Sequence, residues 1–260
     1  MSLLRLESVT LYAPEASGDP IVSDISFEIE TDETLALVGQ SGAGKTSLAL
    51  AIMGLWPGKI DGNIFFMDQE MTSLNETAYQ ELRGRSLALL MQDPLAAINP
   101  TLTIGWQLRE VLRLRRGLSR QAARKESLGW LKKVGLTPVS DLARAYLHQL
   151  SGGMAQRAAL AIAMACQPRL LIADEPFSAL DPLTAASQID IFKQHRSEIG
   201  FSTLLITHNL HLAKELASKV IILKSGKIVE AGRVSSVFTA PSEDYTTQLL
   251  AAGLKPGSSK

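Results

Sequence analysis

Short apolar runs alternate with segments of helical periodicity along this chain. Residues 35–38, 170–173, 203–206 and 220–223 form runs of strand length that are almost entirely apolar. Such runs are typical of strands buried on both faces of a parallel sheet, and the segments between the later runs have the helical character of crossover connections. The pattern predicts an α/β fold built around a mostly parallel sheet.

The first part of the chain has a different hydrophobic pattern. Residues 3–12 and 21–30 are predicted strands, and Ile25, Phe27 and Ile29 of the second strand alternate with polar residues. Alternation with a period of two is typical of a strand that buries one face. We therefore expect half-buried strands here and fully buried strands in the later runs.

Residues 95–164 change to helical spacing. Ile104, Leu108 and Leu112 recur at the intervals of one helix face, and a second helical pattern runs over residues 122–134. No strand-like run interrupts these two patterns. The sequence thus predicts a helical insert within the α/β fold.

A glycine-rich loop follows the apolar run 35–38. It fits the pattern Gly-x-x-x-x-Gly-Lys-Thr and leads into the helix-forming residues 47–53. Glycines permit the backbone conformations that aim successive N–H groups inward, lysine supplies a positive charge, and a threonine hydroxyl can ligate Mg²⁺. The loop therefore predicts a site for a nucleoside triphosphate with Mg²⁺. The residues predicted to bind it are Gly39, Gln40, Ser41, Gly42, Ala43, Gly44, Lys45, Thr46 and Ser47.

An acidic pair ends the apolar run 170–173. Hydrolysis of a triphosphate requires Mg²⁺ held opposite the phosphates and a group that positions water, and both are best placed at the carboxyl end of a buried strand. Asp174 is predicted to reach the Mg²⁺, directly or through water, and Glu175 to polarise the attacking water as general base. Alone, such a pair also fits a solvated strand end or a helix cap. Its combination with the phosphate loop favours the catalytic interpretation.

Composition narrows the class of protein further. The 260 residues are 46% hydrophobic and 20% charged, which allows a large core, and 26 basic residues balance 26 acidic ones. Without a global basic field we expect no binding to nucleic acid, and a membrane role would need a protein partner. Charge interrupts the N-terminal apolar residues too early for a secretory signal, and no apolar run approaches the ~20 residues that span a bilayer. The expected compartment is the cytoplasm.

Three further motifs follow the phosphate loop in a fixed order. They are Leu150-Ser151-Gly152-Gly153-Met154-Ala155-Gln156-Arg157, Ala173-Asp174-Glu175-Pro176 and Ser178-Ala179-Leu180-Asp181. In order and spacing they resemble the signature, Walker B and D-loop motifs of the ATP-binding cassette (ABC) ATPases, and the resemblance covers nearly the whole chain.

The resemblance implies a fold and a domain organisation. The fold is that of a P-loop NTPase of the ABC type, with a mostly parallel sheet core, an antiparallel β subdomain and an inserted α-helical subdomain. A single ABC ATPase domain is then expected over residues 1–260. Residues 1–94 and 165–260 would form its nucleotide-binding core, and residues 95–164 the helical subdomain that carries the signature.

The resemblance also assigns roles to residues outside these motifs. Gln92 resembles the Q-loop glutamine, which senses the γ-phosphate and Mg²⁺, and His208 resembles the switch histidine. Tyr12 lies where the family commonly places an aromatic ring against adenine, and a core aromatic on an edge strand fits that position nearly as well. The implied catalytic residues are Glu175, His208 and Gln92; the implied Mg²⁺ ligands are Thr46, Gln92 and Asp174; the further nucleotide-binding residues are Tyr12, Ser151, Gly152, Gly153 and Asp181.

Other residues with potential chemistry receive no role. His148, His195 and His211 lie in helical or loop contexts and are expected to be solvated. Cys166 is the single cysteine, so an internal disulfide is excluded, and its place in a helical run predicts a small core residue.

The signature predicts a partner. Ser151, Gly152 and Gly153 are expected to start a helix whose first N–H groups can bind a γ-phosphate. In the family two subunits pack head to tail, so that each ATP is held by the phosphate loop of one subunit and the signature of the other. The expected partner is a second ABC ATPase subunit, identical or paralogous, and ATP binding and hydrolysis close and release the pair. Met154 stands where the family most often has glutamine, which concerns only fine tuning because the phosphate contacts come mainly from Ser151 and the backbone.

Residues 91–105 point to one branch of the family. They resemble the importer ATPases for oligopeptides, dipeptides and nickel or metal chelates, and residues 238–246 resemble the C-terminal element of the same branch. Peptide importers often carry a longer C-terminal extension with clustered cysteines, and this sequence lacks one, which favours the nickel or metallophore type. The implied assembly contains two transmembrane permease subunits, docked through the Gln92 loop and the helical insert at the cytoplasmic face of the inner membrane. An external substrate-binding protein would act indirectly.

Two other functions compete with the importer hypothesis. A soluble ABC ATPase serving DNA repair, translation or a carbon-phosphorus lyase type of assembly would usually have two cassettes or a long coiled-coil insert, and this sequence shows neither. An ATP-binding regulatory module without turnover would not need Lys45, Asp174, Glu175 and His208 together. The leading hypothesis is the ATP-hydrolysing subunit of a bacterial ABC importer for peptides or nickel or metal chelates.

Overall fold

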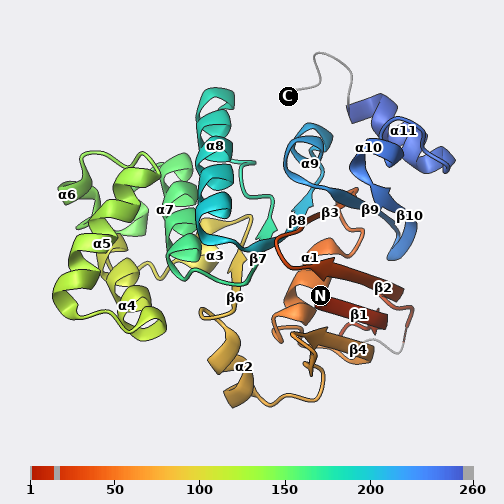
Figure 1. Cartoon of the computed structure of the whole chain (residues 1–260), viewed down its shortest axis with the longest axis horizontal. Coiled ribbons are helices and arrows are strands. Elements are labelled where there is room, and N and C mark those ends of the chain that lie inside the picture. The colour runs from red at the N-terminus through yellow and green to blue at the C-terminus, as the bar shows by residue number, and fades with distance from the viewer. Residues whose placement is uncertain (1, 15–17, 254–260) are drawn as a thin grey trace. The chain divides into compact units, whose positions relative to one another are not determined.

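The computed structural model describes residues 2–14 and 18–253 (Figure 1). By its internal contacts the chain divides into two compact units. The first unit comprises residues 1–79 and 202–260, and the second comprises residues 80–201. The predicted helical subdomain, residues 95–164, lies wholly within the second unit. Helix α2 (Glu76–Leu82) lies at the boundary in the sequence.

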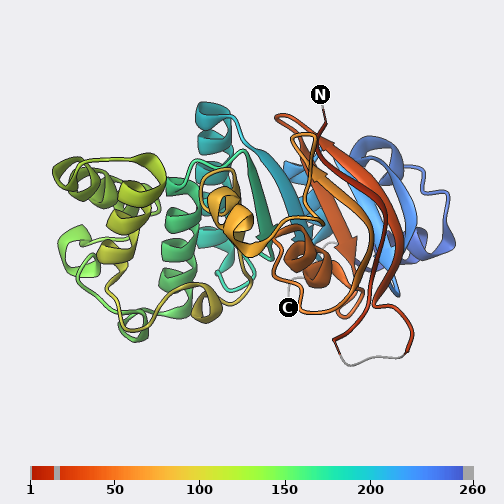
Figure 2. The ribbon, with the colours of Figure 1, turned by 90° about the horizontal axis from the view of Figure 1, so that it is seen from below.

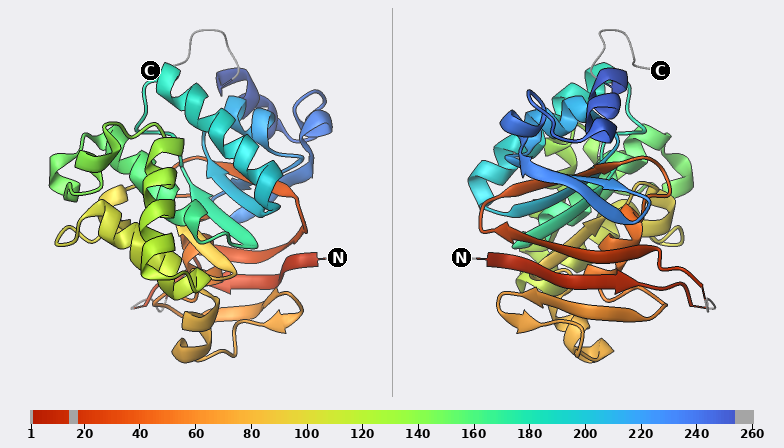
Figure 3. Two further views of the ribbon diagram at one scale, coloured as in Figure 1. Left: turned by 60° about the vertical axis from the view of Figure 1, so that its left-hand side comes forward. Right: turned by 90° about the vertical axis from the view of Figure 1, so that its right-hand side faces the viewer.

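The first unit contains an antiparallel sheet of four strands in the order β2-β1-β4-β5 (Figure 3). The strands are β1 (Ser2–Leu11), β2 (Val22–Glu30), β4 (Ile60–Phe66) and β5 (Gln69–Glu70). Ile25 and Ile29 of β2 are fully buried, whereas Ser26 and Glu28 between them are exposed. The alternation that predicted this strand therefore marks its buried face.

The same unit contains the buried parallel strands. Strand β3 (Thr34–Gly39) pairs in parallel with both β8 (Ser202–Thr207) and β9 (Lys219–Lys224), and β10 (Lys227–Arg233) pairs antiparallel with β9. Every residue of β3 and β8 is buried, as expected for a strand covered on both faces.

Among the described residues, the helices lying wholly within this unit are α1 (Lys45–Ile52), α9 (Leu210–Leu216), α10 (Val234–Val237) and α11 (Asp244–Gly253). Helices α9, α10 and α11 pack their apolar residues against strands β3 and β9. The buried residues of this cluster are Ala36, Val38, Leu210, Ala213, Val220, Ile222, Val234, Val237 and Leu250. Burial of this apolar surface is the main force that holds β3 in place.

The second unit pairs β6 (Leu87–Leu90) in parallel with β7 (Leu170–Asp174) and is otherwise helical. Helices α4 (Ile104–Arg116) and α5 (Arg120–Lys133) pack against each other and against α7 (Gly152–Ala165) (Figure 2). The caps explain where two of these helices begin, because Thr103 and Ser119 each accept a hydrogen bond from a backbone N–H of the first turn. The helices are α3 (Pro94–Ala97), α4 (Ile104–Arg116), α5 (Arg120–Lys133), α6 (Val139–Leu142), the 3₁₀ helix η1 (Leu147–Gln149), α7 (Gly152–Ala165) and α8 (Pro182–Ile199).

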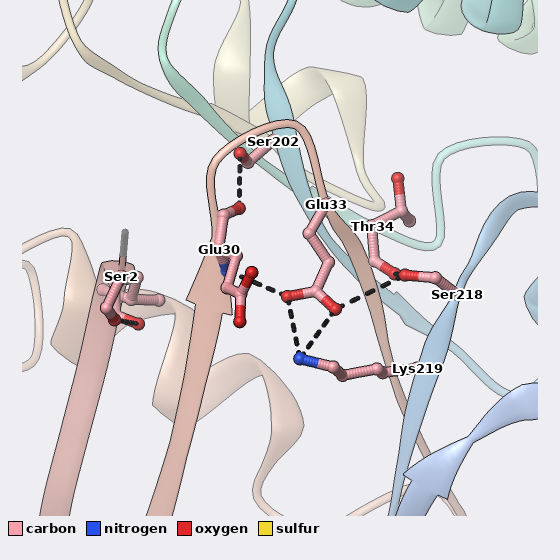
Figure 4. A network of polar contacts seen from close by, with 8 residues as sticks. Ser2, Glu30, Glu33, Thr34, Ser202, Ser218 and Lys219 are labelled. Atoms are coloured by element: carbon pink, nitrogen blue, oxygen red, sulfur yellow. Dashed lines mark hydrogen bonds and ion pairs between the residues drawn. The ribbon is translucent and has the colours of Figure 1, made fainter.

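A polar network fixes the turn that leads into β3 (Figure 4). The Glu33 carboxylate accepts a hydrogen bond from the backbone N–H of Glu30 at 2.8 Å and pairs with the Lys219 ammonium at 3.0 Å. The Ser218 hydroxyl donates to the backbone carbonyl of Thr34 at 3.1 Å. The network therefore ties the start of β3 to the start of its neighbour β9, and charge-assisted contacts of this kind are stronger than neutral ones.

None of the helices in the part of the chain that the structure describes is long and apolar enough to cross a membrane. Cys166 is buried at the end of α7, which confirms the expected core position. Burial raises the pKa of its thiol to about 11, so the reactive thiolate form is disfavoured at neutral pH.

The expectation that His195 is solvated is wrong. This residue on α8 is only 3% exposed, and its ring packs against Trp130 of α5, with the ring centroids 5.1 Å apart. Helical position alone does not tell which face is buried, and His195 lies three residues after the buried Phe192 on the same face of α8. His148 and His211 are exposed, as expected.

His195 makes the stability of the second unit sensitive to acid. Burial and the Lys133 ammonium lower the pKa of His195, and they outweigh the Glu198 carboxylate 3.2 Å away, which raises it. The unfolded chain therefore binds this proton more readily than the folded one, and stability falls as the pH drops below about 6.5.

We expect His195→Gln to flatten the dependence of the unfolding free energy on pH between about 7 and 5. Urea unfolding at a series of pH values measures this slope. His211→Gln, at an exposed position, is the matched control and should leave the slope unchanged. An equal slope in the His195 variant and the wild type would contradict the assignment.

Candidate nucleotide-binding site

The predicted site residues are divided between the two units. The first unit carries Tyr12, the phosphate loop of residues 39–47, and His208; the second carries Gln92, Ser151, Gly152, Gly153, Asp174, Glu175 and Asp181. In each unit part of the set lies at the carboxyl ends of parallel strands, where ligands of α/β sheets commonly bind.

The glycines of the phosphate loop meet two different requirements. Gly42 and Gly44 adopt positive φ angles of 80° and 96°, a region that disfavours residues with a side chain. At Gly39 the requirement is steric, because a Cβ there would lie 2.3 Å from the carbonyl oxygen of Leu223 on β9 and would clash with it. The prediction that glycines shape the loop is confirmed, and the close approach of β9 is a reason that the sequence pattern did not reveal.

The Lys45 ammonium is held by the loop that precedes it. Its Nζ donates hydrogen bonds to the carbonyl oxygens of Gly39 at 2.8 Å and Gln40 at 2.9 Å, and the residue is only 9% exposed. Gln40, Ser41 and Gly42 in contrast are exposed. The loop thus keeps a positive charge at its base while its tip stays open to solvent.

Helix α1 starts directly from this loop. Its N-cap, Gly44, provides no side-chain acceptor for the N–H groups of the first turn, and that turn contains no acidic residue. The start of a helix carries a partial positive charge, so an anion is favoured there. Thr46 lies in the same turn and is an exposed residue.

His208 reaches the same edge of the sheet as the phosphate loop. The parallel pairing aligns Val38 of β3 with Thr207 of β8, so Gly39 and His208 stand at equivalent positions where these strands end. Beyond His208, Asn209 caps α9 by accepting a hydrogen bond from the N–H of Leu212 at 3.1 Å. The strand end and the cap fix the backbone on both sides of the histidine.

The second unit repeats this arrangement with acidic residues. Leu90 of β6 aligns with Ala173 of β7, so Gln92 and the Asp174–Glu175 pair both stand at the carboxyl ends of these strands. Asp174 and Glu175 are buried, whereas Gln92 is exposed. Glu175 has a φ of 47°, a strained conformation for a residue with a side chain, and such strain persists where the surroundings impose it.

The signature motif forms the start of α7, as predicted. Ser151 is the N-cap, and its hydroxyl oxygen accepts a hydrogen bond from the backbone N–H of Met154 at 3.3 Å. Because Met154 contributes its backbone to this cap, the departure from glutamine leaves the cap unaffected. A Cβ on Gly153 would lie 3.3 Å from Leu180, so the helix start is close to the segment 178–181.

Asp181 caps the next helix. Its carboxylate accepts a hydrogen bond from the backbone N–H of Thr184 at 3.0 Å, at the start of α8. The Thr184 side chain and backbone N–H lower the pKa of Asp181. The carboxylate is therefore charged at neutral pH and serves as a structural cap, alongside its predicted place in the nucleotide site.

Gln156 is a residue of the site to which the sequence assigned no role. Its side chain is 1% exposed, donates to the carbonyl oxygen of Glu175 at 3.2 Å and accepts from the N–H of Ala179 at 3.1 Å. It therefore joins the signature helix to the segment that follows the acidic pair. A polar residue among the small apolar residues of α7 is the signal that indicates such a buried contact.

Tyr12 lies immediately after β1 and is half-buried. The alternative of a core aromatic assumed that Tyr12 lies on an edge strand. Strand β1, which precedes Tyr12, instead has β2 and β4 as neighbours on its two sides. The backbone N–H of Tyr12 donates to the carbonyl oxygen of Lys59 at 3.0 Å.

Comparison with known proteins defines the class. The family model described as ABC transporter matches residues 22–178, which is more than half of the chain. The chain belongs to the ABC transporter family.

The named proteins that are similar to this chain include ATP-binding proteins of peptide transport. The oligopeptide transport ATP-binding protein AppD of Bacillus subtilis is 40% identical over 96% of this chain and 77% of its own length. The dipeptide transport ATP-binding protein DppD of Escherichia coli is 36% identical over 97% of this chain and 78% of its own length. Among solved structures, the dimeric ATP-binding cassette MJ0796 in a post-hydrolysis state with ADP and Pi has a TM-score of 0.80 and 25% identity, covering 89% of this chain and 98% of that one.

We expect Gln156→Leu to loosen the segment after Glu175, because the N–H of Ala179 loses its acceptor. A buried donor without a partner costs about 1–3 kcal/mol of stability. Hydrogen exchange at the Ala179 amide, together with urea unfolding, measures the effect. Gln121→Leu on the exposed face of α5 is the control, and unchanged exchange at Ala179 would show that Gln156 does not hold this segment.

Proposed function

We propose that this chain binds ATP with Mg²⁺ and hydrolyses it as the ATPase subunit of a bacterial peptide importer. The observation that carries the proposal is the phosphate loop, in which two left-handed glycines and the buried Lys45 lead into a helix start without a side-chain cap. This combination favours a polyphosphate because backbone N–H groups and a lysine charge converge on one loop.

Five residues carry the chemistry in this proposal, and Tyr12 contacts the base. The buried Glu175 carboxylate accepts the proton of the attacking water, and His208 and Gln92 orient the water and the γ-phosphate. Asp174, Thr46 and Gln92 offer the carboxylate, hydroxyl and amide oxygens that Mg²⁺ prefers, and the bound ion would neutralise part of the phosphate charge. Tyr12 stacks on the adenine ring.

The signature supports a composite site between two subunits. Ser151, Gly152 and Gly153 form a helix start that suits a γ-phosphate, in the way that the first turn of α1 suits the same group. We propose that they bind the ATP of a partner ATPase subunit, with Asp181 beside them. The partner is a second copy or a paralogue, and the dimeric MJ0796 cassette supports such a pairing.

The names of the relatives support peptides as cargo. AppD and DppD are named for oligopeptide and dipeptide transport, whereas nickel appears in neither name. Two permease subunits would receive the ATPase through the Gln92 loop and the helical region at the cytoplasmic face of the membrane, with an external binding protein delivering cargo. A soluble assembly or a regulatory module without turnover is not favoured by these relatives.

We expect Glu175→Gln to bind ATP with unchanged affinity and to hydrolyse it roughly 10²- to 10⁴-fold more slowly, the usual contribution of a general base. Phosphate release and equilibrium binding of ATP, measured on the same preparation, separate the two properties. Glu28→Gln, at an exposed position on β2, is the matched control. Phosphate release near the wild-type rate would show that another group positions the water.

Uptake in cells tests the cargo. A deletion strain complemented with the wild-type chain should take up a labelled dipeptide, and one complemented with Glu175→Gln should not, because transport depends on turnover. A labelled nickel chelate, followed in the same strains, should enter equally in all of them. Uptake of the chelate that depends on this chain, without uptake of the dipeptide, would overturn peptide cargo.

A further inference from the structure

The backbone of Tyr12 is held from both sides by one short segment, residues 56–59. The indole N–H of Trp56 donates to the carbonyl oxygen of Tyr12 at 3.1 Å, and the carbonyl oxygen of Lys59 accepts from the N–H of Tyr12 at 3.0 Å. The Lys59 ammonium also lies over the Tyr12 ring, 5.3 Å from its centroid. Both backbone polar groups of Tyr12 are thus satisfied by this one segment.

Gly58 makes the contact between Trp56 and Tyr12 possible. A Cβ at position 58 would lie 1.9 Å from the carbonyl oxygen of Tyr12 and 2.9 Å from the indole nitrogen of Trp56. A side chain here would therefore intrude between donor and acceptor. The requirement is for space, because Gly58 is not among the glycines with positive φ.

The chain path connects this segment to the phosphate loop. Helix α1 begins at Lys45, within the phosphate loop, and ends at Ile52. Only three residues separate Ile52 from Trp56, and the backbone N–H of Leu55 bonds to the carbonyl oxygen of Leu50 at 2.8 Å, which ties this connection to the last turn of α1. The continuous segment 45–59 therefore begins within the phosphate loop and ends in contact with the backbone of Tyr12.

We infer that Trp56 and Gly58 are positioning residues for the base of the nucleotide. They hold Tyr12 after the end of β1, so that its ring is pre-ordered for stacking, while the Lys59 ammonium lies over the same ring. The inference rests on the proposed binding of ATP, in which Tyr12 contacts adenine. It goes further by naming the residues that place this aromatic and by linking base recognition to α1.

Comparison of ATP with inorganic tripolyphosphate isolates the contribution of the base. Tripolyphosphate offers the same phosphate contacts and nothing to stack, so a positioning role of Trp56 appears only in the ratio of the two affinities. Trp56→Phe keeps an aromatic ring and removes the N–H donor. We expect it to weaken ATP binding about fivefold, as for loss of one neutral hydrogen bond, and to leave tripolyphosphate binding within about twofold of the wild type. Calorimetric titration measures both affinities.

Two further variants make the test independent of Trp56 itself. Gly58→Ala should weaken ATP binding at least as much as Trp56→Phe, because its methyl group displaces the Tyr12 carbonyl. Gly129→Ala is its matched control, since a Cβ at that exposed position of α5 meets no atom within 4 Å. Tyr12→Leu removes the ring altogether and therefore measures the largest loss of ATP affinity expected from the absence of stacking.

The outcomes separate this inference from the proposed function. Loss of affinity for ATP alone, in the order Tyr12→Leu, Gly58→Ala and Trp56→Phe, supports the positioning role. Equal losses for both ligands, or no loss in Trp56→Phe and Gly58→Ala, overturn it. If the wild type binds tripolyphosphate as tightly as ATP, this inference alone is overturned, because the base then adds nothing to the affinity while the phosphate site remains. Failure of the wild type to bind either ligand overturns the proposed function together with the inference.

Discussion

The parallel pairing of β3 with β8 and β9 is the constraint on which the first unit depends. It sets the carboxyl ends of β3 and β8 at one edge, so the residues at these ends, Gly39 and His208, are delivered to the same place. It also brings the carbonyl oxygen of Leu223 so close to Gly39 that no side chain fits there. The Glu33 network fixes the other end of β3, where the strand enters the sheet. A shift in this register would move the phosphate loop as a whole, because the loop begins where the strand ends.

In the second unit, buried polar contacts hold the acidic residues of the candidate site in place. Glu175 is held at a φ that its side chain disfavours, and its carbonyl oxygen accepts hydrogen bonds from Gln156 at 3.2 Å and from the Ser178 hydroxyl at 3.0 Å. These contacts surround the strained residue and offset the cost of its conformation, which is of order 1–3 kcal/mol. Gln156 belongs to the signature helix. The signature therefore has a structural duty toward the acidic pair in addition to its proposed contact with a phosphate.

Much of this architecture is predictable because local rules and tertiary structure agree. The apolar runs became buried strands, the Ser151 pattern became a capped helix start, and the phosphate loop took left-handed conformations at Gly42 and Gly44. The rest depended on contacts between residues far apart in the sequence. The burial of His195 follows from which face of α8 meets Trp130, and periodicity within α8 alone does not identify that partner. The steric role of Gly39 likewise comes from β9, which lies far along the chain.

In the proposed binding mode, the contacts of Tyr12 explain why residues outside the motifs matter for nucleotide recognition. Phosphate binding uses backbone groups and a helix start, which a short sequence pattern is sufficient to encode. Stacking of a base uses the position of a single ring, and a ring just beyond a strand end is free to adopt several rotamers unless its backbone is fixed. Here the fixing comes from Trp56 and Lys59, which follow α1 and have no place in any motif. In the proposed binding mode, discrimination between a nucleotide and a bare polyphosphate depends on residues 56–59, where the pair Pro57-Gly58 by itself indicates only a turn.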